Sequence, residues 1–198
     1  MTFAYAMHPG QVIGAPAWVE QERWNVTAQP DGEGAPSDRQ WRAALRRLLA
    51  DRFKLQFARE TRELSAYVLT QQPGGHKMNK SGGDPNGLPG MFFKGPGMLP
   101  VINANMTDFT GLLQAVVLDR PVVDRTGITG RFDFTLQWLP DESQFGGRGG
   151  QMAAALQGNA EQRPGLFTAL QEQLGLKLES TRTPVEVLVI ESAARPEN

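Results

Sequence analysis

The chain has 198 residues, of which 40% are hydrophobic and 21% charged, and its 20 basic and 21 acidic side chains leave a net charge of −1. This composition excludes a disordered tail and suits one domain, or two small ones, with a sizeable core. The absence of cysteine excludes disulfides, thiol nucleophiles and thiolate metal sites. No apolar run reaches the roughly 20 residues that span a bilayer. No basic residue precedes Arg23, so we expect no signal peptide within the chain.

The first long helix is predicted to begin at Ser37. Gln40 follows three residues later, which is the spacing of a capping box. Apolar residues then recur at helical spacing, and arginines fall on the opposite face: Trp41, Ala44, Leu45, Leu48 and Leu49 against Arg39, Arg42 and Arg46. Upstream, Phe3–Met7 is expected to close a helix and Trp24–Ala28 to form a strand.

Two further helices are predicted downstream. One begins near Thr107-Asp108 and is stopped by Pro121, and the other runs from Pro164 to a C-terminal cap at Gly175. Their apolar stripes are Phe109, Leu112, Leu113, Val116 and Val117 in the first and Leu166, Phe167, Leu170 and Leu174 in the second.

Alternating apolar and polar residues follow each helix and predict strands. The clearest strand runs from Arg131 to Trp138, and a short one is expected at Val122-Val123. The strands expected after the first and third helices come in pairs joined by turns. After the first helix, the charged segment 59–63 joins strands at residues 53–57 and 66–69. After the third helix, residues 181–184 join strands at residues 176–179 and 185–190.

The order helix–strand–strand thus occurs three times and predicts an internal repeat, with convergent patterning as the alternative. We expect an α+β fold in which antiparallel sheets carry helices on one face and two related halves make up the chain. The N-terminal half is expected over residues 1–72 and the C-terminal half, with two helix–strand–strand units, over residues 101–198. A loop rich in Gly and Pro, residues 73–100, separates them.

A second long loop is expected over residues 140–164. It includes the glycine run Gly146–Gly150, which lacks the Lys-Ser/Thr that follows a phosphate-binding loop, so we interpret the run as a flexible connection. Loops as long as these two are either functional or mobile.

The first loop contains an apolar triplet, Met91, Phe92 and Phe93. A mobile loop rarely exposes two phenylalanines without a use. The triplet is therefore the candidate binding site, where it could cover the sheet as a lid or offer an anchor to a partner. Packing into the core of the protein is the alternative.

The sequence offers few candidate catalytic residues. Its two histidines, His8 and His76, lie in loop-like segments without the spacing of a zinc site, and we predict no metal ligands. A Ser81–His76 pair stays open as an arrangement without a known motif. No serine lies in the turn that exposes a hydrolase nucleophile: Ser37, Ser65, Ser81, Ser143, Ser180 and Ser192.

Three acids, Asp119, Asp124 and Asp133, lie close together in sequence. Two carboxylates held near each other could bind a divalent metal such as calcium, or divide acid and base roles. Because Asp124 precedes Thr126-Gly127, it is more typical of a turn whose side chain accepts backbone N–H groups. We therefore predict no cofactor. A divalent metal such as calcium remains an option only under the alternative hypothesis that the protein is an enzyme.

Basic residues gather near the first helix: Arg39, Arg42, Arg46, Arg47, Arg52 and Lys54. A basic face can contact phosphates, but the whole chain has a pI near 6.1. We interpret these residues as a solvated helix face and predict no nucleic-acid partner.

Several segments resemble a large family of soil-associated bacterial proteins, abundant in acidobacteria and without established catalytic residues. The matching segments are residues 14–18, 48–55, 59–63, 120–127, 130–136, 170–178 and 184–190. Family members usually carry an export signal and one more strand ahead of the point where this chain begins, so the resemblance implies a periplasmic or secreted protein. The helix–strand–strand units are also similar to the small N-terminal modules of secretins and TonB-dependent receptors, which bind envelope proteins and catalyse nothing.

These observations lead to two functional hypotheses. The first is a non-catalytic binding or interaction module of the bacterial envelope, with a protein or small-molecule partner. The alternative is a small hydrolase acting on an ester or lactone, with carboxylates or a loop-bound metal activating water in a cleft under Met91–Phe93. Strand edges such as Val185–Ile190 leave a homodimer open.

Overall fold

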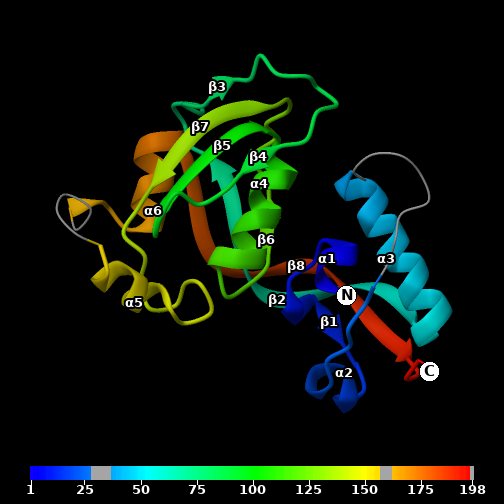
Figure 1. The fold of residues 1–198 in the computed structure, drawn as a ribbon. Coiled ribbons are helices and arrows are strands. Elements are labelled where there is room, and N and C mark those ends of the chain that lie inside the picture. Colours follow the sequence, from blue (N-terminus) through cyan, green and yellow to red (C-terminus); the bar gives the residue numbers. More distant parts are fainter. Residues whose placement is uncertain (28–36, 157–161, 197–198) are drawn as a thin grey trace. The chain divides into compact units, whose positions relative to one another are not determined.

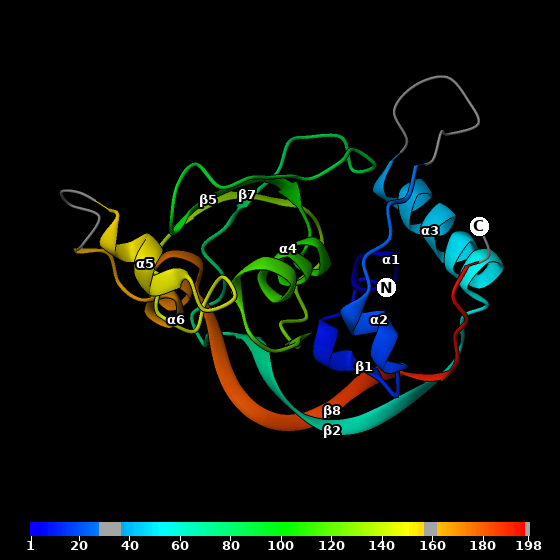
Figure 2. The ribbon, with the colours of Figure 1, turned by 60° about the horizontal axis from the view of Figure 1, so that its bottom comes forward.

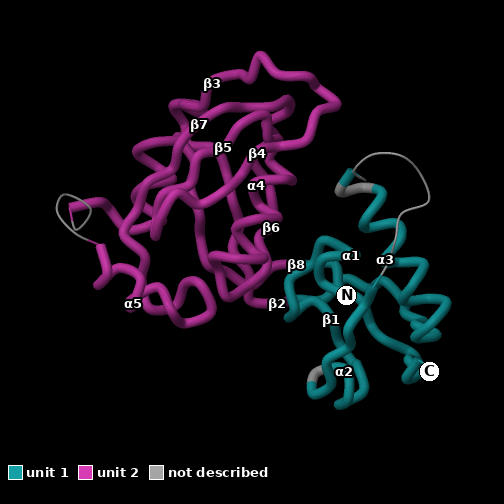
Figure 3. Tube along the Cα trace, viewed as in Figure 1, with its two compact units in different colours: residues 1–63, 184–198 teal, residues 64–183 magenta. Residues whose placement is uncertain are grey.

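The computed structural model describes residues 1–27, 37–156 and 162–196. The chain forms two compact units, one made of residues 1–63 and 184–198 and the other of residues 64–183 (Figure 3). Residues 73–100, which the sequence suggested as a boundary, lie inside the second unit. The chain passes between the units at 63/64 and at 183/184, and both points fall within long strands.

In the described residues of the first unit, the α-helices are α1 (Thr2–Tyr5), α2 (Ala17–Gln21) and α3 (Asp38–Phe53). The capping box predicted at Ser37 and Gln40 is confirmed at the start of α3. The strand predicted over Trp24–Ala28 is wrong for residues 24–27, which are irregular, and Ala28 lies outside the described residues. A small core of this unit contains Met7, Leu55, Leu188 and Ile190.

Two long strands carry the chain through both units. They are β2 (Gln56–Gln71) and β8 (Leu176–Ser192), and they lie side by side (Figure 2). Gln56 contacts Ser192 and Thr70 contacts Lys177, so the strands are antiparallel. The turns predicted at residues 59–63 and 181–184 are therefore wrong. Most of these residues are exposed, and their charge marks a solvated section of strand rather than a turn.

These strands form the centre of a four-stranded sheet with the order β1-β8-β2-β6. The short strands β1 (Val12–Ile13) and β6 (Val122–Asp124) pair in parallel with β8 and β2 respectively. The sheet is therefore mixed, whereas the sequence predicted antiparallel pairing throughout. The strand expected at Val122-Val123 is confirmed.

A second sheet, entirely antiparallel, lies within the second unit and has the order β3-β7-β5-β4 (Figure 1). Its strands are β3 (Asn79–Lys80), β4 (Gly90–Met91), β5 (Met98–Ala104) and β7 (Phe132–Gln137). The strand predicted at residues 131–138 is confirmed, whereas β4 and β5 begin inside the segment expected to be a loop.

Two helices of the second unit, α4 (Met106–Leu112) and α6 (Leu166–Ala169), continue into π-helical turns at residues 113–117 and 170–174. A third helix, α5 (Gly149–Ala154), lies in the segment expected to be the second loop. In the described part of the chain, no helix combines the length and the apolar character that crossing a membrane requires.

The π turns change which residues of each helix are buried. Phe109, Leu113 and Val117 are fully buried at a spacing of four, whereas Val116, predicted to share their stripe, is 44% exposed. A π turn holds more residues than an α turn and keeps residues four apart on one side. The α+β class is confirmed, and the internal repeat stays a prediction.

Candidate functional site

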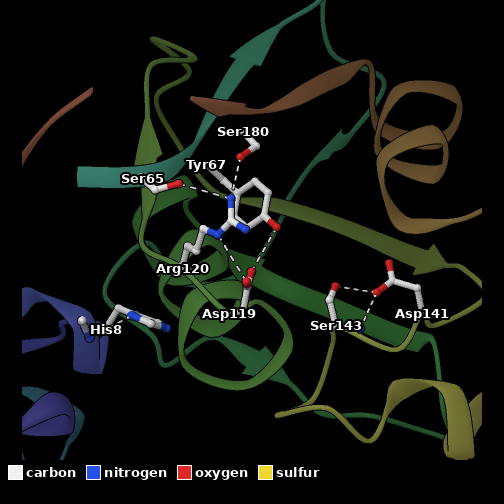
Figure 4. A network of polar contacts seen from close by, with 9 residues as sticks. His8, Ser65, Tyr67, Asp119, Arg120, Asp141, Ser143 and Ser180 are labelled. Atoms are coloured by element: carbon white, nitrogen blue, oxygen red, sulfur yellow. Dashed lines mark hydrogen bonds and ion pairs between the residues drawn. The ribbon is translucent and has the colours of Figure 1, made fainter. Parts of the chain in front are cut away.

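A polar network connects β2, β8 and the segment that follows the first π turn. It consists of Ser65, Tyr67, Asp119, Arg120 and Ser180, and we call it the Arg120 network (Figure 4). The backbone brings these residues together because Pro121 accepts a hydrogen bond from the Tyr67 N–H and Val122 pairs with Tyr67 in the sheet.

The side chains of this network satisfy one another. The Tyr67 hydroxyl donates to Asp119 Oδ1 at 3.0 Å, and Arg120 Nε lies 3.2 Å from Asp119 Oδ2. Arg120 Nη1 donates to Ser180 Oγ at 2.8 Å and to Ser65 Oγ at 3.2 Å, and the guanidinium lies 5.6 Å from the centre of the Tyr67 ring. Arg120 thus connects one strand to the other.

The environment raises the pKa of Tyr67 above its usual value. Burial is the main cause, followed by the hydrogen bond to Asp119 and the negative charges of Asp119 and Asp141, while Arg120 acts in the opposite direction. Tyr67 therefore stays protonated at neutral pH and acts as a hydrogen-bond donor. Such a network supports the fold and offers no activated nucleophile.

A pocket of about 410 Å³ that is widely open to solvent lies where β3, β5 and β7 meet the start of α4. We call it the Asn103 pocket, and its lining residues are Lys80, Ser81, Gly83, Pro85, Asn103, Asn105, Gly130 and Arg131. Its position follows from the register, which shifts between Val101 and Ala104 and leaves Asn103 in the left-handed region with a φ of 53°. Asparagine tolerates this conformation better than most residues.

Asn103 is 7% exposed and held through several groups. Its N–H donates to Asp133 Oδ1 at 2.7 Å, its Nδ2 donates to the Asp84 carbonyl at 2.7 Å, and its own carbonyl accepts from Arg131. The amide oxygen Oδ1 is buried without a hydrogen-bond partner among the described residues. An unsatisfied buried acceptor costs about 1–3 kcal/mol. Native structures hold few such atoms.

The triplet Met91–Phe93 divides between core and surface. Phe93 packs on the main core, with ring-centre distances of 6.3 Å to Trp138 and 5.5 Å to Phe145, and Met91 packs there too. Phe92 points the other way and is 54% exposed. The structure therefore supports packing into the core for two of the three residues and leaves Phe92 as a candidate anchor.

The candidate catalytic residues each have a local structural role. His8 caps a 3₁₀ turn through Nδ1, which accepts from the Gly10 N–H at 3.1 Å. The His76 ring packs edge-on against Phe132 at 4.9 Å, and its buried Nδ1 has no partner among the described residues. Ser81 accepts the Gly83 N–H at 3.2 Å, and no hydrogen bond joins it to His76 within the described part of the chain.

The three acids considered as metal ligands serve separate local structures. Asp119 belongs to the Arg120 network, and Asp133 accepts the Asn103 N–H. Asp124 Oδ1 accepts the Thr126 N–H at 2.9 Å, which confirms its predicted turn role. Within residues 1–27, 37–156 and 162–196, no three His, Asp or Glu side chains gather as a metal site would require.

Two arginines of the basic helix face make contacts within the first unit. The Arg46 guanidinium donates to the Ala4 carbonyl at 2.7 Å and lies over the Tyr5 ring. Arg42 lies over the Phe3 ring at 5.2 Å, so these arginines pack on α1. The side chain of Arg39 lies outside the described residues.

Sequence analysis missed both Asn103 and the pair Tyr67–Arg120. Asn103 lies near the end of β5, which starts before Pro100, and taking that proline as the end of a loop concealed the strand. The signal for Tyr67 was its place in the strand predicted at residues 66–69. Nothing in the sequence indicated that Arg120 would lie beside it.

The chain matches a family model described as a protein of unknown function, DUF3738, over residues 1–193. Because the match covers nearly the whole chain, the protein belongs to this family. Neither the curated proteins nor the solved structures contain a significant match. The family description names no activity, so a functional conclusion has to come from the geometry of the chain.

Proposed function

We propose that this DUF3738 protein is a non-catalytic binding module of the bacterial envelope, and that it binds a partner protein through an exposed apolar patch. The patch consists of Phe92 and Ile102, which are 54% and 52% exposed and flank Gly90. We call it the Phe92 patch. This exposure is the observation that carries the proposal, because a soluble domain rarely leaves grouped large apolar residues in water without a use.

Gly90 leaves space in the Phe92 patch for a side chain of the partner. It pairs with Ile102 across the sheet, and a Cβ built on Gly90 would lie 3.6 Å from Ile102 Cβ and 3.7 Å from a Phe92 ring carbon. The missing side chain therefore leaves a gap between two exposed apolar groups. One apolar side chain of a partner would fill this gap and contact both.

The position of β4 favours an extended partner segment. β4 is the last strand in the order of its sheet, so one of its edges faces away from β5. Peptides bind such edges by adding a strand, with backbone hydrogen bonds for affinity and side-chain pockets for specificity. We therefore infer a partner that pairs with β4 and inserts an apolar side chain over Gly90.

The envelope location is supported by resemblance. The segments quoted above resemble exported proteins of soil bacteria, and the helix–strand–strand pattern is similar to secretin and TonB-receptor modules that bind other proteins. Together with the Phe92 patch, this resemblance favours an interaction role in the periplasm or outside the cell.

The test places a photo-crosslinking amino acid at position 92 of the full chain, expressed in its native host. A control chain carries the same group at Thr135, an exposed residue of β7. We expect one discrete adduct in the envelope fraction from position 92 and none from position 135. Equal labelling from both positions, or an adduct confined to the cytoplasm, would contradict the proposal.

The alternative is a small hydrolase acting on an ester or lactone. The observation that favours it is the Asn103 pocket, where Ser81 lies beside Lys80 and Arg131. A panel of esters and lactones, assayed with and without a chelator and again with Ser81→Ala, decides it. Turnover that Ser81→Ala abolishes would establish the hydrolase and contradict a non-catalytic module.

A further inference from the structure

We propose that the Asn103 pocket binds a small hydroxylated oxyanion, such as a sugar acid or a sugar phosphate. This site is separate from the partner surface proposed above. Its volume of about 410 Å³ lies within the usual range for small-molecule sites and suits a ligand of monosaccharide size.

The charged side chains that line the pocket are cationic. Lys80 and Arg131 are the two charged members of the eight lining residues, while Asp133 and Asp108, which are not among the eight, accept the backbone N–H groups of Asn103 and Asn105. Arg131 lies 3.7 Å from Asp108, which partly balances its charge. Lys80 is exposed and makes no ion pair with the described carboxylates, so its ammonium group is available to a ligand.

The uncharged polar groups add hydrogen-bond donors. Asn105 Oδ1 accepts the Asp108 N–H at 2.8 Å, which leaves the Asn105 Nδ2 amide hydrogens for other partners. The Ser81 oxygen accepts the Gly83 N–H, so the Ser81 hydroxyl hydrogen is free to turn toward an acceptor. Lys80, Ser81 and Asn105 therefore present donors suited to the oxygens of a carboxylate or phosphate.

Asn103, in contrast to these donors, presents an acceptor that needs a donor from the ligand. Its Nδ2 donates to the Asp84 carbonyl, which fixes the amide orientation and identifies Oδ1 as the atom without a partner. A buried acceptor needs a donor, and a hydroxyl group beside the anionic group of a ligand would provide one. This pairing of cations with one unsatisfied acceptor distinguishes a hydroxylated anion from a simple one.

The segment over this acceptor, residues 81–87, contains three glycines, Gly82, Gly83 and Gly87. A Cβ at Gly83 would lie 3.0 Å from Asn103 Cγ, and one at Gly87 would lie 3.2 Å from its Nδ2. The backbone reaches the amide this closely only because both residues lack side chains. A ligand hydroxyl that reaches Oδ1 would displace Gly83, and ligand binding should therefore change the backbone around residues 81–87.

The test measures binding to the full chain by calorimetry, with glucuronate, glucose 6-phosphate, glucose and inorganic phosphate as probes. We expect saturable binding of one or both hydroxylated anions, weaker binding of phosphate, and none of glucose. Glucuronate and glucose 6-phosphate distinguish a carboxylate from a phosphate ligand. Binding of phosphate as tight as that of glucose 6-phosphate, or no saturable binding below about 10 mM for any anion, would overturn the proposal.

Matched lysine variants locate the site. Lys80→Glu should weaken binding of the preferred anion about tenfold or more, because it replaces an attractive charge by a repulsive one. Lys94→Glu, which reverses the charge of another exposed lysine of the same unit outside the pocket, should leave affinity unchanged. Equal losses in both variants would mean nonspecific attraction and overturn the assignment. Crosslinking from position 92 does not depend on this outcome, so the two proposals fail separately.

Discussion

Polar residues in this chain differ in whether their hydrogen-bonding groups have partners. Tyr67, Asp119 and Arg120 satisfy one another, whereas Asn103 keeps an acceptor without a partner. A satisfied network stabilises a fold, whereas an unsatisfied buried acceptor beside a pocket is where we propose that a ligand binds. This contrast in hydrogen bonding is not visible in the sequence alone.

The pKa of Tyr67 is directly measurable, because the chain has only two tyrosines. In Tyr5→Phe, phenolate absorbance reports Tyr67 alone, and we expect its midpoint above the usual value of 10.0. Burial and Asp119 favour the protonated form in the folded state. A midpoint at or below that value would contradict the part-buried hydrogen bond to Asp119.

The raised pKa of Tyr67 also determines how the free energy of unfolding changes with pH. Because folding raises the pKa of Tyr67, its contribution is fully present below pH 10.0 and is lost as pH rises through the folded-state value. Tyr67→Phe should therefore reduce the free energy of unfolding by about 1 kcal/mol at neutral pH. Denaturant unfolding at a series of pH values should show this deficit shrinking in alkali, and a constant deficit would count against the linkage.

At the scale of elements, two arginines connect β2 to β8. Arg120 donates to Ser65 and Ser180, and Arg125 donates to Thr183 Oγ1 at 2.6 Å while its N–H donates to the Leu69 carbonyl. Both come from the segment 120–127 that carries part of the family resemblance. This segment thus attaches the two long strands to each other.

Arg120→Ala should lower the free energy of unfolding by about 1–2 kcal/mol, because it removes hydrogen bonds from a partly exposed charged group to two strands. The matched control is Arg59→Ala, which breaks an exposed ion pair with Glu186 in the same two strands. We expect the control to cost about 0–1 kcal/mol. Chemical denaturation of both variants checks this, and a control as costly as Arg120→Ala would refute the proposed strand attachment.

Gly175, predicted from sequence as a helix cap, offers a second comparison. It has a φ of 68°, and a Cβ there would lie 2.3 Å from the Gly75 carbonyl oxygen. Gly127 has a φ of 67° but open space around it. Gly127→Ala should cost about 1–2 kcal/mol from backbone strain alone. Gly175→Ala should cost clearly more by thermal unfolding, and equal losses would show that the close approach to Gly75 is wrong.

The elements that sequence predicted well are those with local signals. The capping box at Ser37, the cap at Gly175 and the strand at 131–138 depend on neighbouring residues and are confirmed. The turns at 59–63 and 181–184 were wrong because a solvated strand and a turn share the same polar composition. The Asn103 pocket could not be predicted, since it depends on a register shift between β5 and β7.

At the scale of the whole molecule, the two units differ in how much apolar surface they bury. The core cluster of the second unit contains 21 buried residues in the described chain, whereas that of the first contains four. Stability is not uniform across such a chain, and the less buried unit should open more readily. Both functional proposals lie in the better packed unit, which can hold a site rigidly.

Hydrogen exchange on the full chain should therefore show weaker protection in α3 of the first unit than in β5 and β7 of the second. The long strands β2 and β8 serve as internal comparison, because each contributes to both units. We expect protection along β2 to rise from residue 56 toward residue 71. Equal protection of α3 and β7 would contradict a difference in local stability.

The most direct test of the binding role combines crosslinking at position 92 with Gly90→Leu. The new side chain would occupy the gap between Phe92 and Ile102, and its Cβ meets both at ordinary contact distances of 3.7 and 3.6 Å, so the fold should remain. The account predicts that the envelope adduct formed from position 92 disappears in this variant while its melting temperature stays unchanged. An undiminished adduct from a folded Gly90→Leu chain would contradict a partner seated on the Phe92 patch.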